Sequence, residues 1–179
     1  YSTAQLLQNS EYSRRFSDGF YFNFYLSPAD CHHVFFPLAG EIIASSYIPG
    51  ALFPVNDFAL RLINRLFCIN ERLITYIRTE HGLVAVVMIG AMCVGQMRVE
   101  YDNWKTNAVR DLFRALVTVD RVCERPVAVN AGDRLGTFFL GSSVVLLFEK
   151  RALVVQKQLC AGAHVHYGSA LALPGQEGA

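Results

Sequence analysis

Charged residues are scarce in this chain. They make up 17% of its 179 residues, and the formal net charge at pH 7 is +1, whereas about a quarter of the residues in an ordinary soluble domain are charged. The sequence contains no basic stripe with interleaved aromatic residues, so we expect no nucleic acid partner. The hydrophobic fraction is 53%, a balance that strands buried on both faces would produce.

Long apolar runs are also missing. The longest extends over residues 83–95 and contains glycines, and it is shorter than the roughly 18 residues that a membrane-spanning helix needs. The sequence therefore predicts that no segment of this chain spans a bilayer.

Paired cysteines are missing as well. The five cysteines are Cys31, Cys68, Cys93, Cys123 and Cys160. Their number is odd and no Cys-x-x-Cys spacing occurs, which argues against a disulfide framework and against a zinc knuckle. We therefore expect no metal cofactor, and free cysteines favour a reducing compartment.

The chain does have many short apolar runs, rich in β-branched and aromatic residues and bounded by Gly and Pro turns. These runs predict strands over residues 20–26, 41–47, 72–78, 83–89, 93–101, 120–129, 137–140, 144–148 and 153–159. Helical spacing is confined to residues 3–16, 57–66 and 104–116. We predict a mainly β (α+β) single domain over residues 1–179, with curled sheets in a barrel-sandwich-like arrangement and a few short helices.

One stretch is unusual, namely GTFFLGSSVVLLFE at residues 136–149. Two β-prone runs flank the small polar break Gly141-Ser142-Ser143. A glycine in such a bend permits close approach to the backbone, so the Ser142 hydroxyl could attack the Gly141 carbonyl. A β-bulge or a tight hairpin with a Ser-capped turn explains the same residues.

Five short blocks in order decide how we interpret that stretch. They are YLSPADCHHVFFP at residues 25–37, PGALFPVN at 49–56, NER at 70–72, IGAMCVG at 89–95 and GTFFLGSSV at 136–144. In this order and with these gaps, residues 1–173 resemble the phosphatidylserine decarboxylase family. The resemblance also implies that the chain is truncated at its N-terminus, because the family carries more sequence upstream.

The resemblance implies a self-processing enzyme. Ser142 would attack the Gly141 carbonyl, and the chain would break between these residues into a large β chain and a small α chain. The small chain would then begin with a pyruvoyl group formed from Ser142. This group is the expected cofactor, and phosphatidylserine in a bilayer is the expected substrate.

The histidine block departs from the family pattern. His32 matches the first of two family histidines and is expected to handle protons during decarboxylation. Phe35 stands where the family has its second histidine, the base for self-cleavage, so Phe35 cannot accept the Ser142 proton. The resemblance also implies an aspartate that orients this base and that lies upstream of Tyr1 in the family, so the activity of this chain is in doubt on both grounds. His33 is a candidate surrogate base. On a strand, His33 and Phe35 should share one face while His32 points to the other.

The expected partner is a membrane surface, to which the chain would attach peripherally on the cytoplasmic face of a bacterial inner membrane or on the mitochondrial inner membrane. Phe20, Phe22 and Phe24 alternate along one predicted strand and could form the contact, although a core-facing strand has the same pattern. The sequence leaves a homodimer open. It also leaves open a second class of function, a processing-defective, non-catalytic β module that binds lipid or has a structural role.

Overall fold

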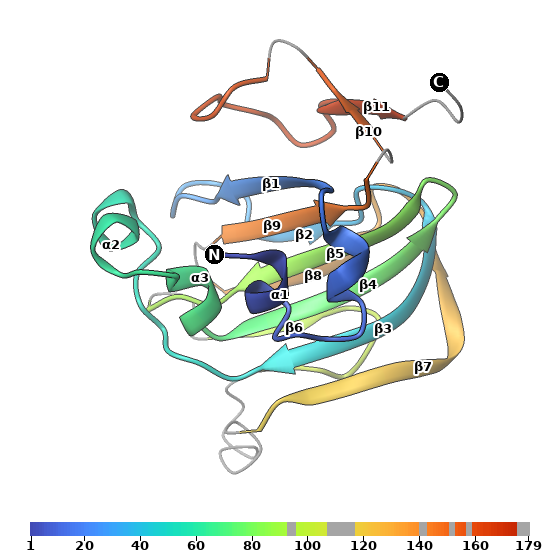
Figure 1. The fold of residues 1–179 in the computed structure, drawn as a ribbon, viewed down its shortest axis with the longest axis horizontal. Coiled ribbons are helices and arrows are strands. Elements are labelled where there is room, and N and C mark those ends of the chain that lie inside the picture. The colour runs from blue at the N-terminus through green and yellow to red at the C-terminus, as the bar shows by residue number, and fades with distance from the viewer. Residues whose placement is uncertain (93–95, 107–116, 140–142, 151–152, 157–158, 175–179) are drawn as a thin grey trace.

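The computed structural model describes residues 1–92, 96–106, 117–139, 143–150, 153–156 and 159–174. Its main element is a six-stranded antiparallel sheet in the order β1-β9-β5-β4-β3-β7 (Figure 1). The strands are β1 Phe20–Tyr25, β3 Gly40–Ile48, β4 Arg72–Thr79, β5 Gly82–Ile89, β7 Val119–Val129 and β9 Ser143–Phe148.

Two smaller sheets complete the β structure. A three-stranded sheet has the order β2-β8-β6, and a two-stranded sheet pairs β10 with β11. Their strands are β2 His33–Phe35, β6 Met97–Val99, β8 Arg134–Phe138, β10 Leu153–Val155 and β11 Ala172–Pro174. The prediction of a mainly β fold is confirmed, and within the described residues the sheets do not close into a barrel.

The helices are short, as predicted. They are α1 Thr3–Leu6, the 3₁₀ helix η1 Ser13–Phe16, α2 Asp57–Leu62 and α3 Leu66–Ile69. The prediction of one continuous helix over residues 3–16 is wrong, because Gln8 and Asn9 take a left-handed backbone with φ of 51° and 56°. The helix predicted over residues 57–66 is likewise divided into α2 and α3, and Arg65 has φ of 57°.

The region predicted as a helix over residues 104–116 falls mostly on residues outside the described part. Its described beginning is not helical, since Lys105 forms an isolated β-bridge with Arg98. The fold at this point therefore extends the edge of the three-stranded sheet.

The core lies on both faces of the central strands. Every residue of β5 after Gly82 is buried, and so is every residue of β9. One face is covered by the N-terminal segment, where the ring of Tyr12 lies 4.4 Å from that of Tyr76. The other face is covered by the three-stranded sheet, which approaches so closely that a Cβ on Gly136 would lie 3.2 Å from the Met88 sulfur.

The aromatic stripe of β1 belongs mainly to this core. Phe22 and Phe24 are half-buried and pack against it, with the Phe22 ring 5.9 Å from that of Phe148. Phe20 is more exposed, and Tyr21 and Tyr25 on the opposite face of β1 are exposed. The core-facing alternative for this stripe therefore fits the structure better than a membrane contact.

Candidate active site

The predicted cleavage site lies in the connection between the two larger sheets. Strand β8 of the three-stranded sheet ends at Phe138, and strand β9 of the six-stranded sheet begins at Ser143. Gly141 and Ser142 themselves are outside the described residues. Ser143 is buried and pairs with Ile89 on one side and with Tyr25 on the other. This connection therefore starts and ends on well-packed strands.

His32 lies beside this connection. Its backbone carbonyl accepts a hydrogen bond from the Phe138 amide at 2.9 Å. Its Nε2 is 3.3 Å from the Pro28 carbonyl oxygen, and because a carbonyl only accepts, this contact assigns the proton to Nε2. Nδ1 then carries the lone pair, and it is buried without a hydrogen-bond partner among the described residues. Among the described residues, His32 thus has one ring nitrogen held by a hydrogen bond and the other without a partner.

The turn before His32 is held by Asp30. Its Oδ2 accepts a hydrogen bond from the Ser27 amide at 2.7 Å, and hydrogen bonds from Ser27 hold the pKa of this exposed carboxyl below its usual value. Asp30 therefore stays ionised and fixes the turn that presents the Pro28 carbonyl to His32.

His33 and Phe35 lie on one face of β2, as predicted. Their rings are 6.5 Å apart, while Val34 between them is buried on the other face. The His33 Nδ1 is 3.0 Å from the Thr137 hydroxyl of the paired strand β8. The nitrogen nearest to β8 is therefore already in a hydrogen bond.

Tyr167 is a neighbour of this strand that sequence reasoning missed. Its ring lies 5.2 Å from that of Phe35, and its hydroxyl is 2.7 Å from the His33 carbonyl and 3.1 Å from the Cys31 carbonyl. Burial raises the pKa of Tyr167 to about 12, so the hydroxyl remains a donor at neutral pH. No sequence signal links residues separated by more than 130 positions.

Asn70-Glu71-Arg72 forms a buried polar cluster at the same end of the sheet. The Asn70 side chain accepts from the Phe53 amide at 3.1 Å and donates to the carbonyls of Phe53 at 2.8 Å and Gly90 at 2.9 Å. It therefore ties the loop over residues 49–56 to the end of β5, next to the strand that begins at Ser143.

The other two residues of this cluster have distinct partners. Glu71 is buried and accepts from the Tyr47 hydroxyl at 2.7 Å. Burial raises the pKa of Tyr47, and the hydrogen bond and charge of Glu71 raise it further. Arg72 donates to backbone carbonyls of Leu6, Cys68, Asn70 and Gln5. Asn70 and Arg72 thus hold the backbone of several segments together at this end of the sheet.

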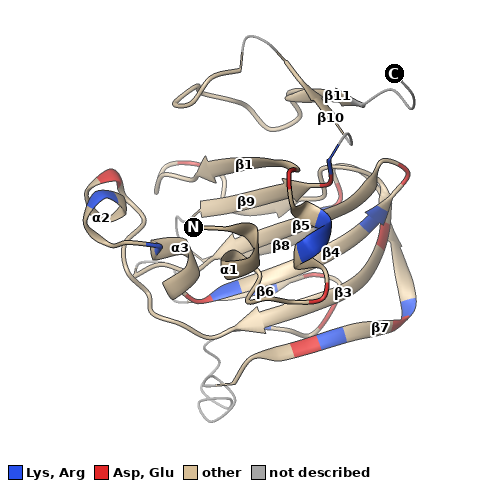
Figure 2. Cartoon of the chain, in the orientation of Figure 1, with Lys and Arg blue, Asp and Glu red and all other residues tan. Residues whose placement is uncertain are grey.

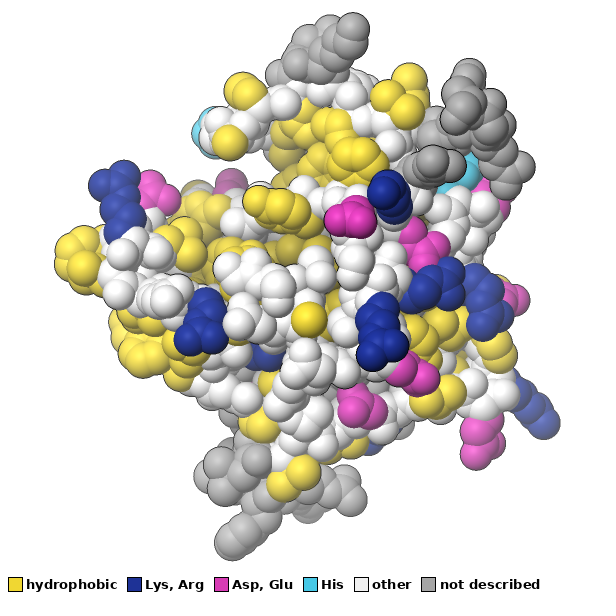
Figure 3. All heavy atoms as spheres, viewed as in Figure 1, with side chains coloured by type: hydrophobic (Ala, Val, Ile, Leu, Met, Phe, Trp, Pro, Cys, Tyr) yellow, Lys and Arg dark blue, Asp and Glu magenta, His cyan; other side chains and the backbone are white. Residues whose placement is uncertain are grey.

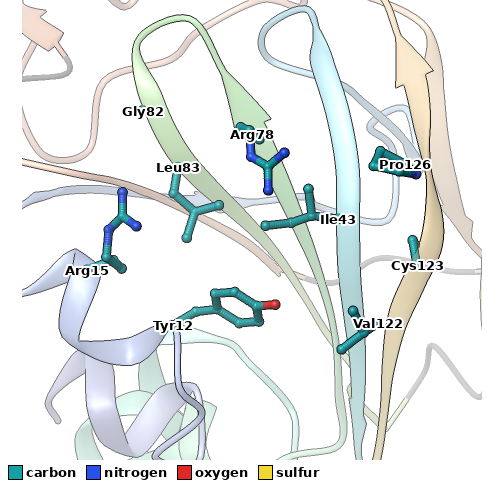
Figure 4. A pocket seen from close by; sticks show the side chains of 9 residues that line it. All are labelled: Tyr12, Arg15, Ile43, Arg78, Gly82, Leu83, Val122, Cys123 and Pro126. Atoms are coloured by element: carbon teal, nitrogen blue, oxygen red, sulfur yellow. The ribbon is translucent and has the colours of Figure 1, made fainter.

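A cavity lies at the opposite end of the six-stranded sheet (Figure 4). It measures about 380 Å³. Its lining residues are Tyr12, Arg15, Ile43, Arg78, Gly82, Leu83, Val122, Cys123 and Pro126. Arg15 pairs with Glu149, and Arg78 lies 3.9 Å from Glu41, so an anion there would compete with carboxylates already in place.

The described part of the chain contains no group of three or more His, Cys, Asp or Glu side chains that could hold a metal ion. It also contains no helix that is both long enough and apolar enough to cross a membrane.

Comparison with known proteins places these observations in a family. The family model described as phosphatidylserine decarboxylase matches residues 1–173. Proteins named phosphatidylserine decarboxylase proenzyme are similar to the chain in Anaeromyxobacter sp. (strain K), at 38% identity over 96% of the chain, and in Pseudomonas aeruginosa (strain LESB58), at 37% over 98%. A third, from Brevibacillus brevis, is 35% identical over 96% of the chain.

The chain spans about three-fifths of the length of these relatives, 60%, 61% and 60% respectively. The matched part nevertheless includes His32, Phe35 and the Gly141-Ser142 bond. The chain belongs to the phosphatidylserine decarboxylase family.

Proposed function

We propose that this chain is the reaction core of a pyruvoyl-dependent phospholipid decarboxylase, which converts phosphatidylserine to phosphatidylethanolamine and CO₂. The observation that carries the proposal is the family match on both sides of the Gly141-Ser142 bond, with relatives that are named proenzymes. A proenzyme is activated by chain processing, and a Gly-Ser bond between two sheets suits such a break. The substrate is a bilayer lipid, so peripheral contact with the inner-membrane surface forms part of the proposal.

The residues around His32 fit a pyruvoyl group formed at Ser142. When present, such a group supplies a carbonyl that withdraws electrons as the carboxylate leaves as CO₂. A proton must then return to the carbon that lost the carboxylate. We assign that proton to the buried Nδ1 of His32, which has no hydrogen-bond partner among the described residues, while the hydrogen bond from Nε2 to the Pro28 carbonyl keeps the ring in orientation.

Lys105 is a second residue with a role in this proposal. Its ammonium lies 5.4 Å from the centre of the Phe139 ring, three positions before Ser142 in the sequence. Phe139 is exposed. A lysine held there can pair with the phosphate of a lipid headgroup while the ring supports the ammonium group.

Phe35 sets the rate that we expect for self-cleavage. The serine hydroxyl is a weak nucleophile until a base takes its proton, and a phenyl ring cannot take one. Because the Nδ1 of His33 is bound to the Thr137 hydroxyl, His33 could substitute for the lost base only through its Nε2. General-base assistance is worth about 10²–10⁴-fold, so we expect this chain to split slowly or to remain whole.

Intact-mass spectrometry tests the processing step. The chain, Ser142→Ala and Phe35→His are incubated side by side, the last also with the upstream family aspartate supplied on a longer chain. We expect a break after Gly141, absent in Ser142→Ala and faster in Phe35→His, with a small fragment that reacts with a carbonyl reagent. A break at another bond, or one that persists in Ser142→Ala, would refute the mechanism.

The substrate assignment has a separate test. The cleaved Phe35→His chain is given phosphatidylserine in mixed micelles, and released CO₂ is measured. If the chain cleaves but releases no CO₂, the self-processing proposal stands and the substrate proposal fails.

A specific observation favours the second candidate, a non-catalytic lipid-binding or structural module. The Phe35 ring is packed against His33 and Tyr167, so the position of the lost base is filled as an ordinary aromatic contact. A chain that stays whole in every variant, including Phe35→His with the aspartate supplied, would support this candidate.

A further inference from the structure

Exposed apolar side chains gather on one side of the domain, around α2 and α3. Figure 3 shows hydrophobic groups over this region, with basic groups beside them. We define the α2 patch as its exposed large hydrophobic residues, which are Phe53, Phe58, Leu60, Leu62, Ile69 and Met92. Apolar clusters that face solvent in this way mark interaction surfaces more often than single exposed residues do.

The centre of the patch is the outward face of α2. Phe58, Arg61 and Leu62 occupy positions i, i+3 and i+4, so they share one side of the helix. Phe58 and Leu62 are 72% and 67% exposed, while Ala59 is buried against the core. The helix is fixed by Asn56, whose side chain caps it through the Ala59 amide at 3.0 Å. The aromatic and aliphatic side chains therefore project from a held backbone.

Two arginines beside the α2 patch, Arg61 and Arg65, lack the acidic partner that most other basic residues in the described part of the chain have. Arg15, Arg78, Arg98, Arg121 and Arg134 each form an ion pair with an Asp or Glu. Arg61 and Arg65 are exposed and have no carboxylate partner within the described part of the chain. Arg61 lies in the last turn of α2 and Arg65 is the N-cap residue of α3, and Figure 2 shows basic segments at α2 and at α3. These two charges are available to an anionic surface.

The patch is connected to the reactive end of the sheet. Asn70 joins the Phe53 backbone to Gly90, and the neighbouring Ile89 pairs with Ser143. Met92 follows Gly90 by two residues. In Figure 1, α2 and α3 lie at the end of the sheet where β9 begins and β1 ends. A surface bound to the patch would thus lie at the end of the sheet where β9 begins at Ser143.

We propose that the α2 patch is the bilayer-docking surface of this chain, with Phe58 and Leu62 inserted among lipid chains and Arg61 and Arg65 placed at anionic headgroups. The inference rests on the proposed lipid substrate and names the surface through which it is reached. A bilayer fits better than a second copy of the chain, because residues 53–70 carry Arg61 and Arg65 but one acid, Asp57, so two copies would bring surplus positive charge together. An anionic leaflet supplies the missing negative charge along the whole face.

Vesicle flotation tests this surface on the chain as it exists, without any need for cleavage. Vesicles of phosphatidylcholine are compared with vesicles that also contain phosphatidylglycerol, so that binding is separated from recognition of the serine headgroup. The variants are Phe58→Ser/Leu62→Ser and Arg61→Gln/Arg65→Gln. The matched control is Val122→Ser on β7, because Val122 is 67% exposed, as Leu62 is, and lines the cavity at the far end of the sheet.

We expect the apolar double variant to lose at least about tenfold in partition to both vesicle types, from the loss of buried apolar area. The arginine double variant should lose about tenfold or more on anionic vesicles only, and Val122→Ser should change less than twofold. Thermal unfolding confirms that each variant is folded. Binding that is absent in the parent chain, or that survives in the apolar double variant, would overturn the proposal.

Two further outcomes are decisive. A dimer by light scattering that Leu62→Ser dissociates, with vesicle binding unchanged, would assign the patch to a second copy and overturn the proposal. Normal flotation behaviour in a chain that never cleaves at Gly141 would support the docking surface while the proposed reaction fails, so the two failures can be told apart.

Discussion

Replacement of Asn70 tests how the loop over residues 49–56 is held at the reactive end of the sheet. Asn70 is fully buried and makes three hydrogen bonds, one accepted from Phe53 and two donated to the Phe53 and Gly90 carbonyls. Asn70→Ala removes all three and leaves the Phe53 amide and the Phe53 and Gly90 carbonyls without these partners. At about 1 kcal/mol for each bond, we expect a loss of roughly 3 kcal/mol, which lowers Tm by about 6–12 °C in a domain of this size.

Asn70→Asp sharpens this prediction. The aspartate keeps the acceptor for the Phe53 amide but turns a carboxylate toward two carbonyl oxygens. We expect it to be less stable than Asn70→Ala at pH 7. Burial raises the pKa of such a carboxyl, so the deficit should shrink as pH falls and the protonated form regains one donor.

Urea unfolding at pH 7 and pH 5 measures both variants, with Asn23→Ala as the control because Asn23 is exposed on β1. That control should lie within about 0.5 kcal/mol of the parent chain. The reasoning is refuted if Asn70→Ala costs less than about 1 kcal/mol, or if Asn70→Asp is the more stable of the two at pH 7.

Other changes probe the same architecture. Tyr47→Phe removes the donor to the buried Glu71 carboxylate and should cost about 1.5–3 kcal/mol in urea unfolding; an unchanged midpoint would contradict an ionised Glu71. The pKa of Tyr167 is raised to about 12 from about 10 in the unfolded chain, so its contribution to the free energy of unfolding is fully present below pH 10 and is lost as pH rises toward 12. Tyr167→Phe should therefore flatten the decline of stability between pH 10 and pH 12. An equal decline in both chains would exclude Tyr167 as its source. Gly136→Ala places a Cβ 2.5 Å from the Arg98 carbonyl oxygen and should lower Tm by several degrees as β6 and β8 separate; an unchanged Tm would show that the two strands can shift at no cost.

The strands were predictable because their signal is local. The runs over residues 72–78 and 83–89 are apolar and β-prone, and the turn between them has Gly82 with φ of 103°, a conformation that glycine adopts at low cost. The observed hairpin joins β4 and β5 at that turn. Burial on both sides of β5 likewise follows from its continuous apolar sequence.

The first helix could not be placed from the same kind of signal. Leu6, Leu7 and Phe16 are buried, so the apolar spacing was meaningful, but the backbone leaves the helix after Leu6. Arg72 explains the early end, because its guanidinium hydrogen-bonds to the Gln5 and Leu6 carbonyls that a longer helix would have used. A partner 66 positions away carries no trace in the local pattern.

The candidate site likewise has some features that the sequence predicted and others that depend on distant parts of the folded chain. The motif predicted His32, and the placement of His33 and Phe35 on one face followed from strand geometry. The free Nδ1 of His32 was not predictable, since it depends on where the Pro28 carbonyl lies in the folded chain. The aromatic cover that Tyr167 places over Phe35 depends on a distant segment in the same way.

Under the proposed mechanism, positions 32 and 35 have different proton-handling roles, and the structure gives them different surroundings. His32 precedes the strand and is tied to Phe138 on the chain that leads to Gly141. Phe35 lies on the other side, between the rings of His33 and Tyr167. A histidine at position 35 would occupy aromatic, partly desolvated surroundings, which disfavour its charged form. Such a histidine would remain neutral and able to accept a proton. Under the proposed mechanism, Phe35 therefore removes the base for cleavage and leaves His32 in place as the proton carrier for decarboxylation.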